Sequence, residues 1–293
     1  MQELKITDVR AVPADSAFLI DDGKTSILYD TGFGFTGERV AKRIKTYLGD
    51  RLLDFIFLTH SHYDHVLGVP YVLKYWPNAK VVAGEYAAKI FTKDTAKALM
   101  CDLDRKFACN CGVEDYEDLT HLLKVDIAVA DGDTIKAGDM TFKVINLPGH
   151  TKCSVGFYCE ARKLFLSCES VGVYYGKNKV MPLYLVGYQM ALDSIKRVEE
   201  LDIENILAPH YGLLSKEESQ EYLKTARTCA VDLACNIKEM LLCGKSKDEI
   251  LEYFKQKFYH GYIDIIYPID ALETNTRITI NLIERELLQK TNN

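Results

Sequence analysis

Three histidines and one aspartate lie within six consecutive positions of this 293-residue chain. They are His60, His62, Asp64 and His65, and they follow the apolar run 55–58, which predicts a buried strand. In an extended or turning segment, residues two positions apart can point the same way, so His60 and His62 can reach one metal ion. Asp64 and His65, further round the turn, can reach a second ion. Imidazole nitrogens and carboxylate oxygens are ligands that zinc, iron and manganese accept.

Two further histidines occupy similar settings later in the chain. His150 follows an expected strand at 142–146, and His210 follows an expected strand at 205–207. A strand end that feeds a polar turn is where an α/β protein usually places its chemistry. The two remaining histidines lack such a setting and are expected to be ordinary surface or interface residues: His121 and His260.

This pattern resembles that of the metallo-β-lactamase superfamily, the αββα metallohydrolases. That family carries a His-x-His-x-Asp-His motif, a Pro-Gly-His-Thr-like turn, an acidic residue after a strand and a last histidine after another strand. The matching residues span roughly the first 212 positions. For the first metal, the resemblance implies the ligands His60, His62 and His150. For the second metal, it implies the ligands Asp64, His65 and His210.

One position departs from the family pattern. After the expected strand at 163–166, the family usually has Gly-Asp, and that carboxylate bridges the two metals. This chain has Ser-Cys-Glu-Ser at 167–170, where Glu169 is the only acid. We therefore expect Glu169 to bridge the metals or to bind one of them. The alternative is that Glu169 points elsewhere and that the site holds a single metal. The resemblance also implies that Asp30 lies beneath the metals.

The predicted reaction is hydrolysis by a metal-activated hydroxide, for which no serine or cysteine nucleophile is needed. Two dications about 3.5–4 Å apart lower the pKa of a shared water and stabilise the charge that develops under attack. Asp64 and Glu169 are the predicted catalytic carboxylates, and the resemblance implies that Asp64 relays a proton to the leaving group. The expected substrate is a small molecule, such as a thioester, a lactone or another ester. Two zinc ions per chain are expected, although iron and manganese also suit a site without thiolates.

Two other classes of function stay open. The first is a non-haem iron oxidoreductase of the same fold, for example one that oxidises persulfides. Its di-iron relatives usually replace the second motif histidine with glutamate and carry a flavin domain, so His62 argues against them. The second is a sensor that binds metals and a ligand without turnover. The complete set of predicted ligands argues against a sensor.

The composition predicts a globular protein with an ample core, because 48% of the residues are hydrophobic. No stretch approaches the roughly 20 apolar residues that span a bilayer, and no signal peptide is visible. The net charge of −6, without any run of basic residues, argues against nucleic acid and anionic membranes as partners. Nine cysteines without a secretory signal favour a cytoplasmic location. A homodimer is left open.

The expected fold is α/β, a four-layer αββα sandwich with a helical insertion and a C-terminal helical extension. The catalytic domain is expected at 1–213, with a helical cap inserted at 93–123. A helical region at 214–293 is expected to pack on that domain. We expect the insertion and the C-terminal helices to shape the substrate pocket over the metals. Helical spacing of apolar residues predicts helices at 36–48, 96–109, 189–201, 215–243, 247–258 and 271–288.

Two groups of side chains have an open role. Four tyrosines follow Glu169, in a segment that overhangs the pocket in the family. They can bind an apolar substrate and donate a hydrogen bond to an oxyanion, or they can form a packed aromatic loop: Tyr174, Tyr175, Tyr184 and Tyr188. A second, structural zinc site is conceivable at three cysteines and one histidine, but their spacing matches no compact zinc finger: Cys101, Cys109, Cys111 and His121.

Overall fold

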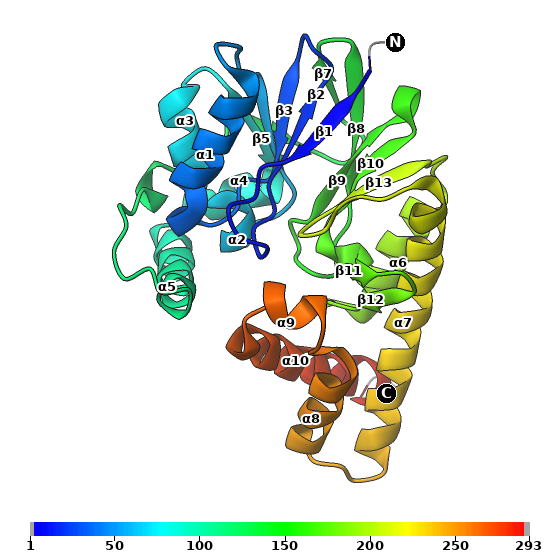
Figure 1. The fold of residues 1–293 in the computed structure, drawn as a ribbon. Coiled ribbons are helices and arrows are strands. Elements are labelled where there is room, and N and C mark those ends of the chain that lie inside the picture. The colour runs from blue at the N-terminus through cyan, green and yellow to red at the C-terminus, as the bar shows by residue number, and fades with distance from the viewer. Residues whose placement is uncertain (1–2, 290–293) are drawn as a thin grey trace.

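The computed structural model of the chain describes residues 3–289. The outer ends of the predicted regions 1–213 and 214–293, namely residues 1–2 and 290–293, lie outside the described residues. In the described part, two six-stranded sheets pack face to face, and helices cover the outer face of each sheet (Figure 1). This arrangement confirms the predicted αββα sandwich.

The first sheet has the strand order β1-β2-β3-β4-β5-β6. Strands β1 to β3 pair antiparallel, whereas β3 to β6 pair in parallel. Parallel strands are buried on both faces and therefore read as apolar runs, which explains the sequence Phe-Ile-Phe-Leu of β4. The bounds are β1 (Lys5–Asp8), β2 (Phe18–Asp21), β3 (Ser26–Tyr29), β4 (Phe55–Leu58), β5 (Lys80–Gly84) and β6 (Ile127–Val129).

The second sheet has the strand order β14-β13-β10-β9-β8-β7. Its pairs are antiparallel except for β10 and β13, which run in parallel. The bounds are β7 (Thr134–Ala137), β8 (Met140–Asn146), β9 (Val155–Cys159), β10 (Leu164–Leu166), β13 (Asn205–Ala208) and β14 (Gly212–Leu213). A separate small hairpin, which the sequence did not predict, consists of β11 (Val173–Gly176) and β12 (Lys179–Met181).

Apolar side chains fill the space between the layers. Between the sheets, the ring of Phe57 packs on Phe142 at 5.3 Å and on Phe157 at 4.7 Å between centroids. Outside the first sheet, Val40 and Ile44 of α1 are fully buried, one helical turn apart. The helices on this side are α1 (Gly34–Leu48), α2 (Tyr63–Val66), α3 (Val69–Tyr75) and α4 (Glu85–Phe91). Outside the second sheet lie α6 (Tyr188–Glu199) and α7 (Lys216–Leu242).

The predicted insertion contains α5 (Asp94–Asn110) and a short 3-10 turn (Thr120–Leu122). Asp104 of α5 is buried, and its carboxylate accepts hydrogen bonds from the backbone N–H groups of Gly34 (2.9 Å) and Phe35 (3.1 Å). It also accepts one from the Tyr116 hydroxyl. The N-cap residue of α1 makes no side-chain cap of its own. Asp104 therefore satisfies the unpaired N–H groups of α1 and fixes α5 against that helix.

Replacing Asp104 with alanine is expected to destabilise the protein by about 1–3 kcal/mol, because buried donors lose their acceptor. Burial raises the pKa of Asp104 from 3.8 to about 6, so the folded state binds a proton that the unfolded state has released. The contribution of Asp104 to stability, and with it the loss in the variant, should therefore shrink as the pH rises through about 6. Denaturant unfolding across this pH range measures both effects. Asp102→Ala, at an exposed position of α5, is the control, and equal losses in the two variants would contradict the prediction.

The C-terminal part is helical, as predicted, and consists of α7, α8 (Lys247–Phe258), α9 (Tyr262–Ile266) and α10 (Ile269–Ile283). Capping boxes start α7 at Ser215 with Glu218 and α8 at Ser246 with Glu249. The sequence did not predict α9, which is separated from α10 by Tyr267 and a proline. Among the described residues, no helix combines the length and the hydrophobicity that crossing a lipid bilayer requires.

Candidate metal centre

The predicted ligands come from four strand ends at one edge of the two sheets. The His60–His65 motif follows β4, and His150 follows β8. Glu169 follows β10, and His210 follows its parallel neighbour β13. Before His150, Gly149 has φ +148°, and a Cβ there would lie 2.7 Å from the Cα of Ala191 in α6. Only glycine fits this turn, which places His150 at the sheet edge.

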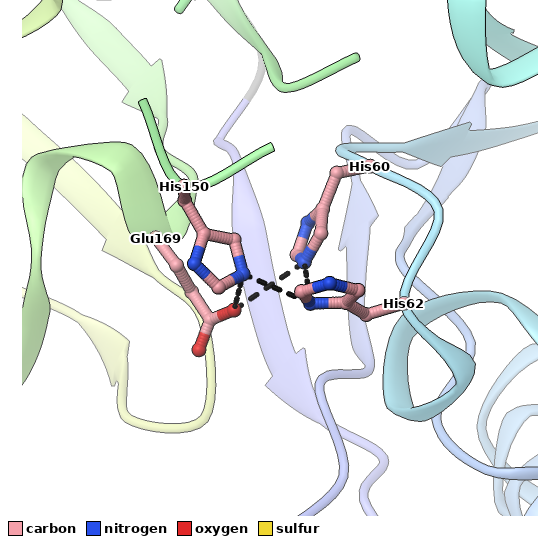
Figure 2. Close-up of side chains that lie close together, drawn as sticks. All are labelled: His60, His62, His150 and Glu169. Carbon is pink, nitrogen blue, oxygen red and sulfur yellow. Dashed lines mark hydrogen bonds and ion pairs between the residues drawn. The ribbon is translucent and has the colours of Figure 1, made fainter. Parts of the chain in front are cut away.

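The first group consists of His60, His62, His150 and Glu169, and one ligand atom of each lies within 4.8 Å of the others. Figure 2 shows these side chains pointing toward one another. His62 Nδ1 lies 3.1 Å from His60 Nε2 and 2.9 Å from His150 Nε2. Glu169 Oε2 lies 2.9 Å from His150 Nε2 and 3.3 Å from His60 Nε2. Four potential donor atoms therefore converge on one small volume.

The second group consists of Asp64, His65 and His210. Asp64 Oδ2 lies 3.6 Å from His65 Nε2 and 3.7 Å from His210 Nε2. The Glu169 carboxylate lies between the two groups, because its Oε2 is also 3.6 Å from His65 Nε2 and its Oε1 is 3.5 Å from His210 Nε2. The longer glutamate side chain thus reaches both groups from the position where the family usually has aspartate.

The imidazoles of both groups are oriented by contacts at their other ring nitrogen. His65 Nδ1 lies 2.7 Å from the Asp30 carboxylate, which also accepts hydrogen bonds from Thr59 and Ser16. His150 Nδ1 lies 3.0 Å from the Leu183 carbonyl. Such partners fix the ring and the tautomer, so that the remaining nitrogen faces the metal. Asp30 therefore lies beside the second group, where the resemblance implied it would be.

The backbone of His210 has a separate support. Its φ is +61°, in the left-handed region, and its carbonyl accepts a hydrogen bond from the Tyr262 hydroxyl of α9 at 2.6 Å. The Arg10 guanidinium donates to the same carbonyl and, at 2.9 Å, to the Tyr262 oxygen. His210 Nδ1 lies 2.9 Å from the Ala14 carbonyl. A segment near the N-terminus and helix α9 of the C-terminal part thus hold the last residue of the second group in place.

In the first group, the electrostatics favour neutral His60 and His62 beside an ionised Glu169. Burial, together with the neighbouring histidines, lowers the pKa of His60 well below its ordinary value and that of His62 to about 3. Burial acts to raise the pKa of Glu169, but His150 and the other imidazoles outweigh it and hold that pKa well below its ordinary value. Burial likewise acts to lower the pKa of His65, but Asp64 and Asp30 outweigh it and raise that pKa well above its ordinary value. The second group therefore favours a cation at His65 Nε2.

The donor set fits divalent metal ions. Three buried atoms that face the site have no hydrogen-bond partner among the described residues: His65 Nε2, His210 Nε2 and Glu169 Oε1. Unpaired buried polar atoms are costly, and bound cations would satisfy all three. Nitrogen and oxygen atoms without thiolates suit zinc, iron or manganese.

A cleft of about 200 Å³ opens onto the two groups through His62, Asp64 and Glu169. One wall comes from α5 and the opposite wall from α9 and α10, as expected for a pocket shaped by the insertion and the C-terminal helices. An ion pair between Lys106 of α5 and Asp270 of α10 joins these walls. The apolar lining consists of Phe33, Leu103, Phe107, Ile266, Pro268 and Ala271. A molecule that enters this cleft must therefore fit between the two walls.

Of the two interpretations of the four tyrosines after Glu169, that of pocket residues is wrong and that of a packed aromatic segment is right. None of them lines the cleft in the described part of the chain, and Tyr174 and Tyr184 are almost completely buried. Tyr174 packs edge-on against Tyr211 and Tyr222, so the aromatic segment belongs to the core. The conceivable second zinc site is not formed either, because residues 3–289 bring no further compact group of metal-binding side chains together.

Several residues of the site escaped the sequence predictions. Arg10, Lys106 and Tyr262 have no motif around them, and their roles depend on contacts between distant segments. One signal was available in the C-terminal region, where a proline interrupts a predominantly helical stretch directly after Tyr267. A proline in this setting marks a corner between helices, and here that corner enters the cleft.

Comparisons with known proteins agree with this geometry. The chain is 30% identical over 140 residues to glyoxylase B2 of Dictyostelium discoideum, a match that covers 47% of this chain and 43% of that protein. It is 32% identical over 116 residues to a hydroxyacylglutathione hydrolase of Aliivibrio fischeri, covering 40% of this chain and 32% of that protein. The chain therefore spans less than half the length of these two curated relatives.

Solved structures show the same fold over nearly the whole chain. An archaeal metallo-β-lactamase superfamily protein from Sulfolobus tokodaii has a TM-score of 0.59 at 20% identity and covers 98% of this chain and 100% of its own. A metallo-β-lactamase family protein from Thermus thermophilus has a TM-score of 0.61 at 17% identity, and the match covers 97% of this chain and 93% of that one. The sequence model of the metallo-beta-lactamase superfamily matches residues 12–210, and the match ends at the last histidine of the site. The chain therefore belongs to the metallo-beta-lactamase superfamily.

Proposed function

We propose that this protein is a metal-dependent hydrolase that cleaves a small thioester, lactone or other ester. One observation carries the proposal: an apolar cleft of about 200 Å³ ends directly on His62, Asp64 and Glu169. A space of this size accepts a small acyl group, whereas the walls of α5 and α10 exclude a polymer. The similarity to a hydroxyacylglutathione hydrolase supports a thioester in particular.

In this proposal, His60, His62 and His150 hold one ion, and Asp64, His65 and His210 hold another. Glu169 contacts both groups, and zinc is the proposed metal. When bound, such ions lower the pKa of a water and polarise the carbonyl oxygen of the substrate. The residues of the chain orient the substrate in the cleft and exclude bulk water. Asp64, which lines the cleft, is placed to pass a proton to the leaving group.

Removal of metal is expected to abolish hydrolysis, and its return is expected to restore it. Protein stripped with a chelator and reloaded with zinc, iron or manganese is assayed against a panel of thioesters, lactones, esters and phosphodiesters. Elemental analysis of the reloaded protein should give two ions per chain. A single ion would contradict the dinuclear site. Hydrolysis of phosphodiesters but not of small esters or thioesters would contradict the proposed function. Persulfide oxidation by the iron-loaded protein alone would contradict it as well.

A further inference from the structure

The corner between α9 and α10 lines the cleft that opens onto the metal-binding groups. Tyr267 has an extended backbone (φ −120°, ψ 118°), and Pro268 follows as the N-cap of α10. Because an extended residue before proline ends a helix, the chain turns here. Both residues line the same cleft as His62, Asp64 and Glu169. The corner thus brings a phenol into the site from a region that the family's metal motifs do not include.

A hydrogen bond from Asn275 orients the hydroxyl of this phenol. The side-chain amide of Asn275, on α10, donates from Nδ2 to the Tyr267 oxygen at 2.7 Å. An amide NH₂ group can only donate, so the Tyr267 proton must point away from Asn275. Within residues 3–289, no protein acceptor takes that proton. The phenol is therefore held as a donor whose proton is free for a molecule in the cleft.

The phenol also stays protonated near neutral pH. Burial raises the pKa of Tyr267 well above its ordinary value, and the negative charges of Glu169 and Asp64 act in the same direction. The one lysine that lines the cleft among the described residues is already engaged by an acid. This lysine, Lys106, is paired with the carboxylate of Asp270.

We propose that Tyr267 is a catalytic residue that donates a hydrogen bond from its hydroxyl to the carbonyl oxygen of the substrate, and that Asn275 positions it. This role rests on the proposed hydrolysis of a small ester or thioester. As the oxygen of water bonds to the carbonyl carbon and Asp64 takes up a proton of that water, the carbonyl π electrons move onto the carbonyl oxygen, and the hydrogen bond from Tyr267 strengthens. These electrons then re-form the carbonyl as the C–O or C–S bond breaks, and Asp64 passes the proton to the leaving group. The hydroxyl proton of Tyr267 remains on its own oxygen throughout. A donor that is already oriented toward the developing charge stabilises the transition state more than the substrate.

The test is the Tyr267→Phe variant, assayed with the best substrate of the wild-type protein. The loss of one oxyanion donor is expected to lower kcat by about 10²–10³-fold, with a much smaller change in KM. Asn275→Leu should lower kcat less, because it misorients the donor but does not remove it. The control is Tyr253→Phe, since the Tyr253 oxygen accepts the same kind of hydrogen bond from Asn236 (2.8 Å) away from the cleft.

A second readout does not depend on turnover. A phosphonate ester resembles the tetrahedral, negatively charged state, and its binding is measured by calorimetry in the metal-loaded proteins. Tyr267→Phe should weaken phosphonate binding by a factor comparable to its effect on kcat, with unchanged metal content and thermal unfolding. Wild-type kcat and phosphonate affinity in Tyr267→Phe, or a loss that follows lost metal, would overturn this role alone. If the wild-type protein hydrolyses no ester or thioester, the proposed function itself is wrong, and the role of Tyr267 falls with it.

Discussion

Replacing His62 with alanine is expected to abolish hydrolysis while the fold survives. His62 Nδ1 lies within 3.1 Å of both His60 Nε2 and His150 Nε2, so its loss opens the centre of the first group. Loss of a residue that only supports a metal ligand typically costs about 10–100-fold in metal affinity or activity, and loss of a ligand should exceed that. Because His62 lies on the loop between β4 and α2, its removal leaves the buried strands intact.

The measurement is kcat/KM together with bound metal and thermal unfolding. His121→Ala is the matched control, because His121 is exposed and lies outside both groups. It should leave all three quantities unchanged. Hydrolysis near the wild-type rate in His62→Ala would show that the reaction does not use this metal site.

Replacing Glu169 with glutamine should weaken binding of the second metal ion in particular. Glutamine keeps the shape of the side chain but removes the charge that lies between the two groups. At present, the Glu169 carboxylate lies 3.6 Å from His65 Nε2 and 3.5 Å from His210 Nε2. In the variant, a neutral amide would take its place beside both histidines. We expect the affinity for the second ion to fall by at least about 10-fold, and the rate to fall with it. Titration of metal-free protein, followed by elemental analysis after dialysis, measures the two affinities separately.

Two further variants make the test of Glu169 specific. Glu169→Asp keeps the charge but shortens the reach by one methylene, so it separates the need for charge from the need for length. Glu160→Gln changes an exposed glutamate in the turn between β9 and β10 and should have no effect. Unchanged metal content and rate in Glu169→Gln would mean that Glu169 is a bystander.

The sequence predicted the layers of the fold and the residues that converge on the site, because both leave local patterns. Helix 36–48 was expected from its apolar stripe and is found at Gly34–Leu48. The strand ends that carry His60, His150 and His210 were recognisable because buried strands read as short apolar runs before a polar turn. Glu169 was found because it is the only acid after its strand.

The substrate side of the site could not be predicted, because it depends on contacts between distant segments. Tyr174 and Tyr184 lie near Glu169 in sequence, but the hydroxyl of Tyr184 donates to the backbone carbonyl of Ala230, so its side chain points into the core. Tyr267 lies almost 100 positions from Glu169, yet it lines the cleft because α9 and α10 fold back toward α5. Proximity in sequence was therefore a poor guide to which tyrosines line the cleft.

The hydrogen bonds to the His210 carbonyl have a consequence for the order in which a newly synthesised chain matures. Every proposed ligand has left the ribosome once His210 has, but Tyr262, which donates to the His210 carbonyl, is synthesised 52 residues later. The other donor, Arg10, is synthesised 200 residues before His210, so it is already present when His210 emerges. We therefore expect metal loading of the second group to be timed by the arrival of α9 at the finished sandwich, and not by the synthesis of the ligands themselves.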